Sequence, residues 1–323
     1  MLLRLAASVL LSLVAVEVAA RLAGLRPKDE LAANPNEPIL HAPDPLLGWK
    51  TVPGSYVIPP YAPEGAPARV TIWPDGSRAT ADVPRTSGSE LLLVGCSFAF
   101  GWPISDQETM AWRLQAGHPE LRIVNHAVKA YGTLQALMLL EQLFAAGERP
   151  TRVVYGFHQS HEDRNVAAPR WLAMLERFSR TGGITLPYAS LRPDGSIERH
   201  PPERYPTLPL RGTLASVAYV EDLLVRPAKL RVLGKRRVTE QLILAMRDLC
   251  VRHGVRFDVV LLQASAEARS AYGRFFAREK IAYADCVVPI PPELRVPGEG
   301  HPGPVIHESW TACVENRLLR TGA

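Results

Sequence analysis

Residues 90–101, ELLLVGCSFAFG, decide the fold of this chain. Residues 91–94 are consecutive apolar residues without polar alternation, which is the pattern of a strand covered on both faces of a parallel sheet. Gly95 and Gly101 bracket the turn that follows, and this turn presents one hydroxyl, that of Ser97. Open α/β sheets bind ligands beyond the carboxyl ends of their strands, so Ser97 is a candidate nucleophile. The same short pattern also fits an ordinary turn serine.

Strands and helices are predicted to alternate from residue 89 onward. Apolar runs predict strands at residues 121–128, 152–157, 256–263 and 282–290. Helical periodicity predicts helices at residues 106–116, 133–146, 239–253, 265–280 and 305–319, with one more starting near Glu162. Thr133 is expected to cap the second of these helices. Repeated strand-helix-strand units predict a three-layer α/β/α fold around a central parallel sheet.

Residues 181–213 interrupt this alternation. They are rich in proline, glycine and arginine and have no clear period. We interpret them as an insertion in the α/β domain, either a lid over the site or a mobile loop.

The amino-terminal segment, residues 1–25, is predicted to be a membrane helix. About 20 apolar helical residues match the roughly 30 Å of a bilayer core. Glu17 and Arg21 interrupt the apolar run, but they are four residues apart and neutralise one another on one helix face. An uncleaved signal anchor is favoured over a cleaved signal peptide and over a buried core helix. More basic residues follow the segment than precede it, so the charge distribution does not support an exported body.

Residues 26–88 are rich in proline and irregular. Within them, residues 69–80 (RVTIWPDGSRAT) form two β-prone arms around a Pro-Asp-Gly turn, which predicts a hairpin. We interpret the segment as a small, partly β collar, with a disordered linker as the alternative. The predicted organisation is therefore a membrane helix (1–25), a collar (26–88) and an α/β domain (89–323).

Composition restricts the function. With 323 residues and 47% hydrophobic residues, the chain can hold one sizeable core. The net charge of +5 is mild, and the basic run at 229–237 is interpreted as a solvated helix face, with contact to anionic lipid or polysaccharide as the alternative. Nucleic acid is not expected as a partner, because no nucleic-acid motif accompanies this run. The four cysteines lack Cys-x-x-Cys spacing, so neither a metal site nor another cofactor is predicted.

A second chemical feature lies near the carboxyl end, in residues 297–303 (PGEGHPG). This predicted loop carries His301 and Glu299 directly before the last helix. Histidine accepts a serine proton near neutral pH, and a neighbouring carboxylate fixes its tautomer. In isolation His301 would be read as a surface histidine. Placement of Ser97 at a strand end and of His301 at a helix start, in one parallel sheet, predicts that the two meet.

These residues resemble the SGNH/GDSL hydrolase family. GCSFAFG looks like the first block of that family, Gly-Asp-Ser, and GEGHPG looks like its last block, Asp-x-x-His-Pro. Residues 124–135 (VNHAVKAYGTLQ) and 155–165 (YGFHQSHEDRN) are similar to the second and third blocks of membrane-anchored bacterial members. GWKTVPG and VTIWPDGSR resemble their collar. The resemblance covers most of residues 46–320 and implies an SGNH, flavodoxin-like arrangement of the sheet.

The resemblance implies that Ser97 is the nucleophile and an oxyanion donor through its backbone N–H, and that His301 is the base. Two departures affect the first blocks. Cys96 replaces the aspartate of Gly-Asp-Ser, which removes a carboxylate that helps to hold the loop. The glycine of the second block falls at Ala130, whose N–H is the expected donor, and Gly132 is the fallback.

The third and last blocks depart as well. The third-block asparagine is missing from its expected place, where Ser160 and His161 stand, so we expect one of these or Gln159 to supply the side-chain donor. A structural role at a helix start is the alternative for His161. Glu299 stands two rather than three residues before His301. Cys286 and Cys313 flank the His301 loop and are either bridged or free buried thiols.

The sequence therefore predicts a membrane-anchored serine esterase or acyltransferase that works without a metal. Acetyl groups on an extracytoplasmic glycan are the leading substrate by family analogy, lipid esters are the second, and the periplasm is the expected location. The alternative is a catalytically degenerate SGNH domain that binds glycan or a partner in cell-envelope assembly. A third interpretation is a scaffold, in which the anchor matters more than the pocket.

Overall fold

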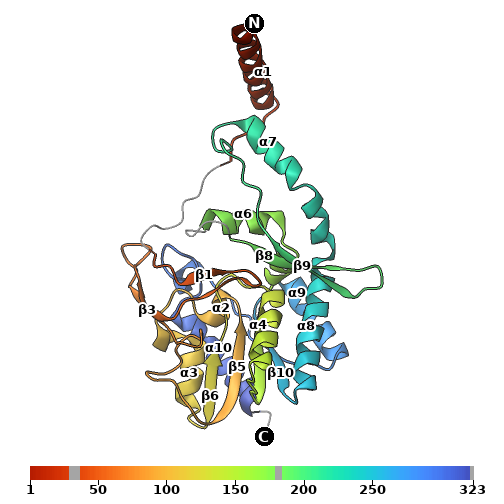
Figure 1. Cartoon of the computed structure of the whole chain (residues 1–323). Coiled ribbons are helices and arrows are strands. Elements are labelled where there is room, and N and C mark those ends of the chain that lie inside the picture. The colour runs from red at the N-terminus through yellow and green to blue at the C-terminus, as the bar shows by residue number, and fades with distance from the viewer. Residues whose placement is uncertain (29–36, 179–183, 321–323) are drawn as a thin grey trace.

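The computed structural model describes residues 1–28, 37–178 and 184–320 of the chain (Figure 1). Its centre is a parallel five-stranded sheet in the order β11-β10-β7-β5-β6. The strands are β5 (Ser89–Gly95), β6 (Leu121–Asn125), β7 (Arg152–His158), β10 (Arg256–Gln263) and β11 (Ala282–Asp285). The first strand, β5, lies between the second and the third, so the winding direction reverses between β5 and β7. This is the flavodoxin-like order, and it confirms the predicted fold class.

The two faces of the sheet bury alternate residues of β5. Leu92 and Val94 point into the core shared with α4 (Thr133–Ala145), α8 (Lys235–Arg252) and α9 (Ala266–Arg278). Leu91 and Leu93 point into the core shared with α3 (Met110–Gly117) and α10 (Pro304–Val314). Because successive strand residues face opposite sides, a strand covered twice needs apolar residues at every position.

The amino-terminal helix α1 (Leu2–Leu22) extends away from this body, and the carboxyl end of the chain lies at the opposite end of the molecule (Figure 1). In the part of the chain that the structure describes, one helix, Arg4–Leu22, is long and apolar enough to cross a membrane, and none of it is buried. A signal sequence has the same length and composition.

The collar is built from two antiparallel pairs. β1 (His41–Asp44) pairs with β2 (Gly48–Thr51), and β3 (Gly54–Ile58) pairs with β4 (Ala68–Ile72). The predicted turn follows β4, because the N–H of Trp73 donates to the carbonyl of Ser77 and the N–H of Ala79 donates to that of Thr71. Residues 37–88 are therefore a β-rich collar, whereas residues 29–36 of the predicted segment lie outside the described residues.

The predicted insertion is partly regular. Its first residues fall in 179–183, outside the described part, but β8 (Leu186–Leu191) and β9 (Ile197–Glu203) form an antiparallel hairpin. Leu186 and Ala189 are buried, so the hairpin is packed on the body. It is followed by α7 (Ala215–Leu224) and the 3-10 segment η2 (Pro227–Gly234), which lead into α8.

Several element ends differ from the sequence prediction. The predicted helix at 106–116 is a short 3-10 turn, η1 (Asp106–Glu108), followed by α3. Gly132, not Thr133, is the N-cap of α4, and the Thr133 hydroxyl instead hydrogen-bonds the hydroxyl of Tyr155. The last strand ends at Asp285 rather than 290, before a proline-rich segment that cannot continue a sheet ladder.

Candidate functional site

Ser97 begins the short helix α2 (Ser97–Phe100) just beyond the carboxyl end of β5. Two glycines allow this helix to sit on the sheet. Gly95 and Gly156 are register partners in β5 and β7, and a Cβ on Gly156 would lie 2.8 Å from the Cβ of Ala99. Any larger residue would push α2 off the strand ends. Ser97 is thus held at the point where the winding of the sheet reverses.

The loop before α10 brings His301 to Ser97. The Nε2 atom of His301 lies 2.9 Å from the Oγ of Ser97, although the two residues are 204 positions apart. The Nδ1 atom of His301 lies 2.8 Å from each carboxylate oxygen of Glu299. Ser97, His301 and Glu299 therefore form one continuous chain of hydrogen bonds.

Glu299 fixes the tautomer of His301. An ionised carboxylate only accepts, so the proton of the neutral ring sits on Nδ1 and Nε2 is free to accept the Ser97 hydroxyl proton. Burial by itself raises the pKa of Glu299, but the hydrogen bonds and charge of His301 outweigh burial and hold this pKa below its usual value. Glu299 also accepts from the indole N–H of Trp102, at 3.2 Å. Glu299 thus reaches the ring although it stands two residues before His301, because its side chain is longer than that of an aspartate.

A buried arginine from the collar holds the turn after Ser97. The guanidinium of Arg78 is fully buried and donates to the carbonyls of Phe100 and Gly101, at 2.9 and 2.6 Å, and to the carboxylate of Asp106, at 3.0 Å. The sequence analysis predicted that this loop is held less well, because Cys96 replaces an aspartate whose carboxylate would help to hold it. Arg78 supplies the support from outside the α/β domain, and sequence reasoning missed it.

Ala130 lies in the loop after β6, with φ of 70°. This left-handed conformation is unusual for alanine and is the one that glycine adopts freely. The loop is tied to the sheet because the N–H of Val128 donates to the carbonyl of Gly95, at 3.1 Å. Neither the Ala130 N–H nor the Ser97 N–H has an acceptor among the described residues. Both remain candidate oxyanion donors.

Gly132 does not fit the fallback role. Its N–H donates to the side-chain oxygen of Gln135, at 3.1 Å. A Cβ at this position would lie 2.7 Å from the side-chain oxygen of Asn165. Close packing against α5 (His161–Asn165) therefore explains this glycine.

The third-block candidates also lie elsewhere than expected. His161 is completely buried, and its Nδ1 bonds the hydroxyl of Tyr155, at 2.6 Å, so it cannot contact a substrate. The side-chain oxygen of Gln159 accepts from the N–H of Ser265. The N–H and hydroxyl of Ser160 lie 3.0 and 2.8 Å from the Nδ1 of His158. His161 has a structural role as the buried partner of Tyr155, but it is not the expected cap of a helix start, because the N-cap of α5 is Ser160. Ser160 supports a neighbour.

That neighbour, His158, is the residue that the sequence analysis missed. It is the last residue of β7, and its ring stacks edge-on against Phe98, at 4.4 Å between ring centres, which in turn contacts His301. The Ser160 N–H occupies Nδ1, so the proton of the neutral ring must be on Nε2. Burial, assisted by the charge of Arg164, keeps the pKa of His158 well below its usual value. The ring is therefore a neutral N–H donor packed on Phe98, the residue whose ring also contacts His301.

The sequence contained a signal for His158, because this polar residue directly follows the apolar run of β7, the strand next to β5. Strand β7 was predicted to end at Phe157, one residue early, so His158 was not counted among the residues at the rim.

A cavity of about 370 Å³ opens beside this rim, at the carboxyl end of β10. Gln263, which lines it, is the register partner of His158. Its walls combine apolar residues with two arginines: Ala264, Val287, Val288, Pro289, Ile290, Arg269 and Arg295.

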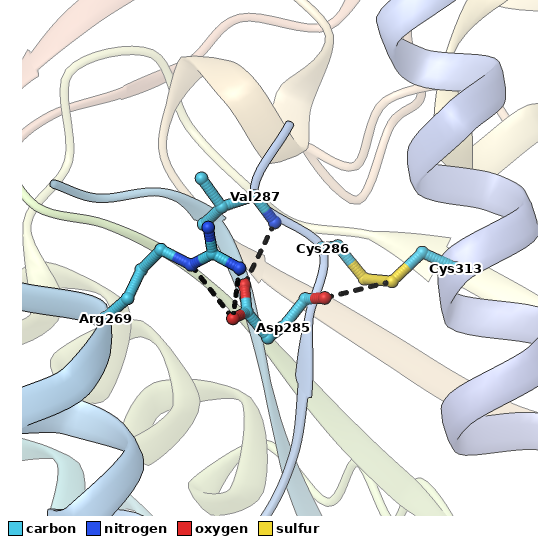
Figure 2. The surroundings of a disulfide bond; sticks show 5 residues. All are labelled: Arg269, Asp285, Cys286, Val287 and Cys313. Atoms are coloured by element: carbon cyan, nitrogen blue, oxygen red, sulfur yellow. Dashed lines mark hydrogen bonds and ion pairs between the residues drawn. A yellow bond between two sulfur atoms is a disulfide. The ribbon is translucent and has the colours of Figure 1, made fainter. Parts of the chain in front are cut away.

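A disulfide fixes the helix that follows the His301 loop. Cys286, directly after β11, is bonded to Cys313 in α10, and the adjacent Asp285 forms an ion pair with Arg269 (Figure 2). Of the two alternatives for these cysteines, the structure has the bridge. Cys96 and Cys250 are buried and unpaired. Within residues 1–28, 37–178 and 184–320, no group of three or more His, Cys, Asp or Glu is arranged to hold a metal ion.

Comparison with known proteins gives similarity to solved structures alone. No family model matches the chain, and no curated protein does. A member of the lipolytic G-D-S-L family from Veillonella parvula is similar with 8% identity and a TM-score of 0.41, covering 72% of this chain and 98% of that one. A putative lipolytic G-D-S-L protein from Desulfitobacterium hafniense has 13% identity and a TM-score of 0.42, covering 72% and 100%. The psychrotrophic esterase EstA from Pseudoalteromonas has 10% identity and a TM-score of 0.41, covering 72% and 98%.

The sheet order is the one that the SGNH resemblance predicts. Similarity at these levels assigns no activity, so the function of this chain is inferred from its own side chains.

Proposed function

We propose that this chain is a serine ester hydrolase or acyltransferase of SGNH type. The observation that supports it most is the unbroken hydrogen-bond chain from Ser97 through His301 to Glu299 at the carboxyl edge of the sheet. A nucleophile, a base within hydrogen-bond reach and a third group that orients the base are the components of acyl transfer through a covalent intermediate.

In the first half-reaction, the Oγ of Ser97 attacks the carbonyl carbon of an ester while its proton passes to the Nε2 of His301. Glu299, which stays ionised, stabilises the imidazolium that forms. The tetrahedral intermediate then collapses. The ester C–O bond breaks, and the leaving alkoxide takes the proton from Nε2, which leaves Ser97 acylated.

We assign the stabilisation of the charge that develops on the carbonyl oxygen to three N–H donors: the backbone N–H groups of Ser97 and Ala130, and the Nε2–H of His158. We assign His158 the side-chain role that the resemblance gives to an asparagine. Its low pKa matters for this role, because a neutral imidazole donates from Nε2 without introducing a buried charge in the resting site.

In the second half-reaction, His301 removes a proton from water or from an acceptor hydroxyl, and the oxygen of that group attacks the acyl carbon. The bond between the acyl carbon and the Oγ of Ser97 then breaks, and the proton passes from Nε2 to Oγ, which restores both residues. Water gives hydrolysis, and a sugar hydroxyl gives acyl transfer. Acetyl esters of a glycan are the proposed substrate by family analogy, and lipid esters are the second choice.

We further propose that α1 anchors the chain and that the body is extracytoplasmic. An unburied apolar helix at the amino terminus supports the anchor. The bond between Cys286 and Cys313 supports an oxidising compartment such as the periplasm.

A fluorophosphonate probe tests the proposal, since it modifies only activated serines. We expect one adduct per chain, located on Ser97 by mass spectrometry, and none in Ser97→Ala. The control is Ser160→Ala, whose hydroxyl lies outside the Ser97–His301 pair and which should be labelled. If the wild-type chain is not labelled, and if Ser97→Ala retains biological activity, the non-catalytic binding domain is the better interpretation.

A further inference from the structure

The segment between the β8–β9 hairpin and α8 buries a charged residue and exposes apolar residues. We call residues 215–234, which contain α7 and η2, the arm. The inward side of the arm carries Glu221, whose carboxylate is completely buried. Its outward side carries leucines: Leu224, Leu230 and Leu233 are 55%, 70% and 86% exposed. Tyr219, Val220 and Leu223 extend the same exposed surface.

The inward side is held by charges from the chain on either side. Glu221 accepts from the ammonium of Lys28, at 2.8 Å, from the guanidinium of Arg211, at 3.2 Å, and from the N–H of Leu208, at 3.0 Å. A buried ion that is paired on several sides resists rotation of its helix, because any turn would leave the charges unpaired. The leucines therefore cannot exchange places with Glu221 and enter the body.

The start of the arm is attached to α1. The carboxylate of Glu17 accepts from the N–H groups of Ala215 and Ser216, both at 3.0 Å, and from the Ser216 hydroxyl, at 2.7 Å. Arg21, paired with Glu17, donates to the carbonyl of Thr213. The two charges that interrupt the apolar helix thus cap α7 rather than merely neutralise one another.

This attachment fixes the depth of the arm. With a rise of 1.5 Å per residue, Glu17 lies about 7–8 Å from the end of α1 at Leu22. Helices that lie in the surface of a bilayer enter it by roughly 5–10 Å. If α1 crosses a membrane, the beginning of α7 is at the boundary between headgroups and acyl chains, and the rest of the arm runs from the base of α1 toward α8 (Figure 1).

The charges on the arm fit this position. Arg226 and Lys229 are exposed and have no ion-pair partner within the described residues, and Arg237 is exposed just beyond the arm. The exposed acid, Asp222, is paired with Lys28. Apolar side chains with unpaired cations between them are the pattern of a helix that binds an anionic bilayer surface.

We propose that the arm is a second membrane contact, which lies in the surface of an anionic bilayer with Leu224, Leu230 and Leu233 in the acyl boundary. The proposal rests on the proposed anchor. It goes beyond it because a transmembrane helix alone leaves the body free to rotate and tilt. Contact at both α1 and the arm holds the body in one orientation, with the end of β5 that carries α2 on the side of the molecule from which α1 extends (Figure 1).

Fluorophore depth tests the proposal on the full chain reconstituted in vesicles of phosphatidylcholine and phosphatidylglycerol. A polarity-sensitive dye is attached to Leu224→Cys or Leu230→Cys, the native free thiols being buried. A shallow spin-labelled lipid is expected to quench about half of the emission at both positions, as for residues in the interfacial zone. The matched control is Val251→Cys at the far end of α8, which is 66% exposed and should not be quenched.

Charge reversal gives an independent measurement. In Arg226→Glu with Lys229→Glu, lipid quenching at position 224 is expected to fall in vesicles that contain phosphatidylglycerol, because each cation near an anionic surface contributes about 1 kcal/mol, or a fivefold change. In vesicles of pure phosphatidylcholine, quenching at position 224 should be the same with and without the two charge reversals.

The outcomes separate the arm from the anchor. If the chain resists extraction by alkaline carbonate but the dyes at positions 224 and 230 are not quenched by the spin-labelled lipid, the anchor is supported and the proposal for the arm is overturned. If the dyes at these positions are shielded from aqueous iodide but are not quenched by lipid, a second copy of the chain covers this surface. That result also overturns the proposal. If carbonate extracts the chain from the vesicles, the proposed anchor is wrong. Quenching of the dyes by added vesicles then decides separately whether the arm binds lipid.

Discussion

The catalytic rim and the arm follow opposite rules of polarity. At the rim, Ser97, His301 and Glu299 are polar groups gathered in a hollow between loops, and each is paired. In the arm, the ionised Glu221 points inward and the leucines point outward. The comparison teaches that buried charge is paired in both regions, and that the side chains left exposed on the arm are largely apolar.

The largest expected effect is at the rim. His301→Gln removes the atom that accepts the Ser97 proton, and kcat should fall by about 10⁶-fold, as for the histidine of another serine triad. Ester hydrolysis measured with a chromogenic ester, beside a thermal unfolding curve that shows an intact fold, checks it. Activity within tenfold of the wild type would mean that His301 is not the base.

The next prediction concerns the buried charge on the inward side of the arm. Glu221→Gln leaves Lys28 and Arg211 without their carboxylate, and the local stability of α7 should fall by about 3 kcal/mol, as when one member of a buried pair is lost. Hydrogen exchange of residues 215–224 measures this. Asp222→Asn is the control, because Asp222 is an exposed partner of the same lysine and should cost less than about 1 kcal/mol. Equal effects of the two changes would argue against a charge-fixed arm.

The disulfide stabilises the body near the His301 loop. Its ends are 27 residues apart, and closing a loop of this length is worth about 3–4 kcal/mol in the chain-entropy model. Cys286→Ala with Cys313→Ala should lose that much unfolding free energy in urea. A reducing agent should destabilise the wild type and leave the double variant unchanged. No effect of the reducing agent would mean that the thiols are free.

His158 distinguishes an oxyanion donor from a packing residue. His158→Ala should reduce kcat by about 10²- to 10³-fold with little change in KM, because the donor acts mainly in the transition state. His158→Asn, which keeps an N–H donor, should recover part of this loss. If both variants lose the same activity, His158 supports the site only by packing against Phe98.

The smallest effect concerns pH. His307 is completely buried, its Nδ1 accepts from the N–H of Met110, and burial lowers its pKa to about 3. The unfolded chain binds this proton near pH 6.5 and the folded chain does not, so stability falls as pH decreases below 6.5. The contribution of one such histidine is about 2 kcal/mol between pH 7 and pH 5. His307→Asn should reduce the difference in unfolding free energy between these pH values by this amount. An unchanged difference would show that His307 is protonated in the folded state.

Much of the body could be predicted because its signals are local. Residues 91–94 are apolar at every position, which is the pattern of a strand covered on both faces, and the glycines that follow favour a strand over a helix. A serine after such a strand and a histidine before a helix reach the same rim in any doubly wound sheet. The apolar run of α1 likewise needs no tertiary contact to be recognised.

Other features were decided by contacts between distant residues. Strand β7 continues one residue further than its apolar run, to His158, whose ring packs on Phe98, whereas His161 is buried against Tyr155. Arg78 supports the Ser97 turn from the collar, and Glu17 caps a helix 198 residues away. Local sequence determines which face of an element is apolar. Only the folded chain determines which buried N–H meets which acceptor, because hydrogen bonds require positions correct to within a fraction of an ångström.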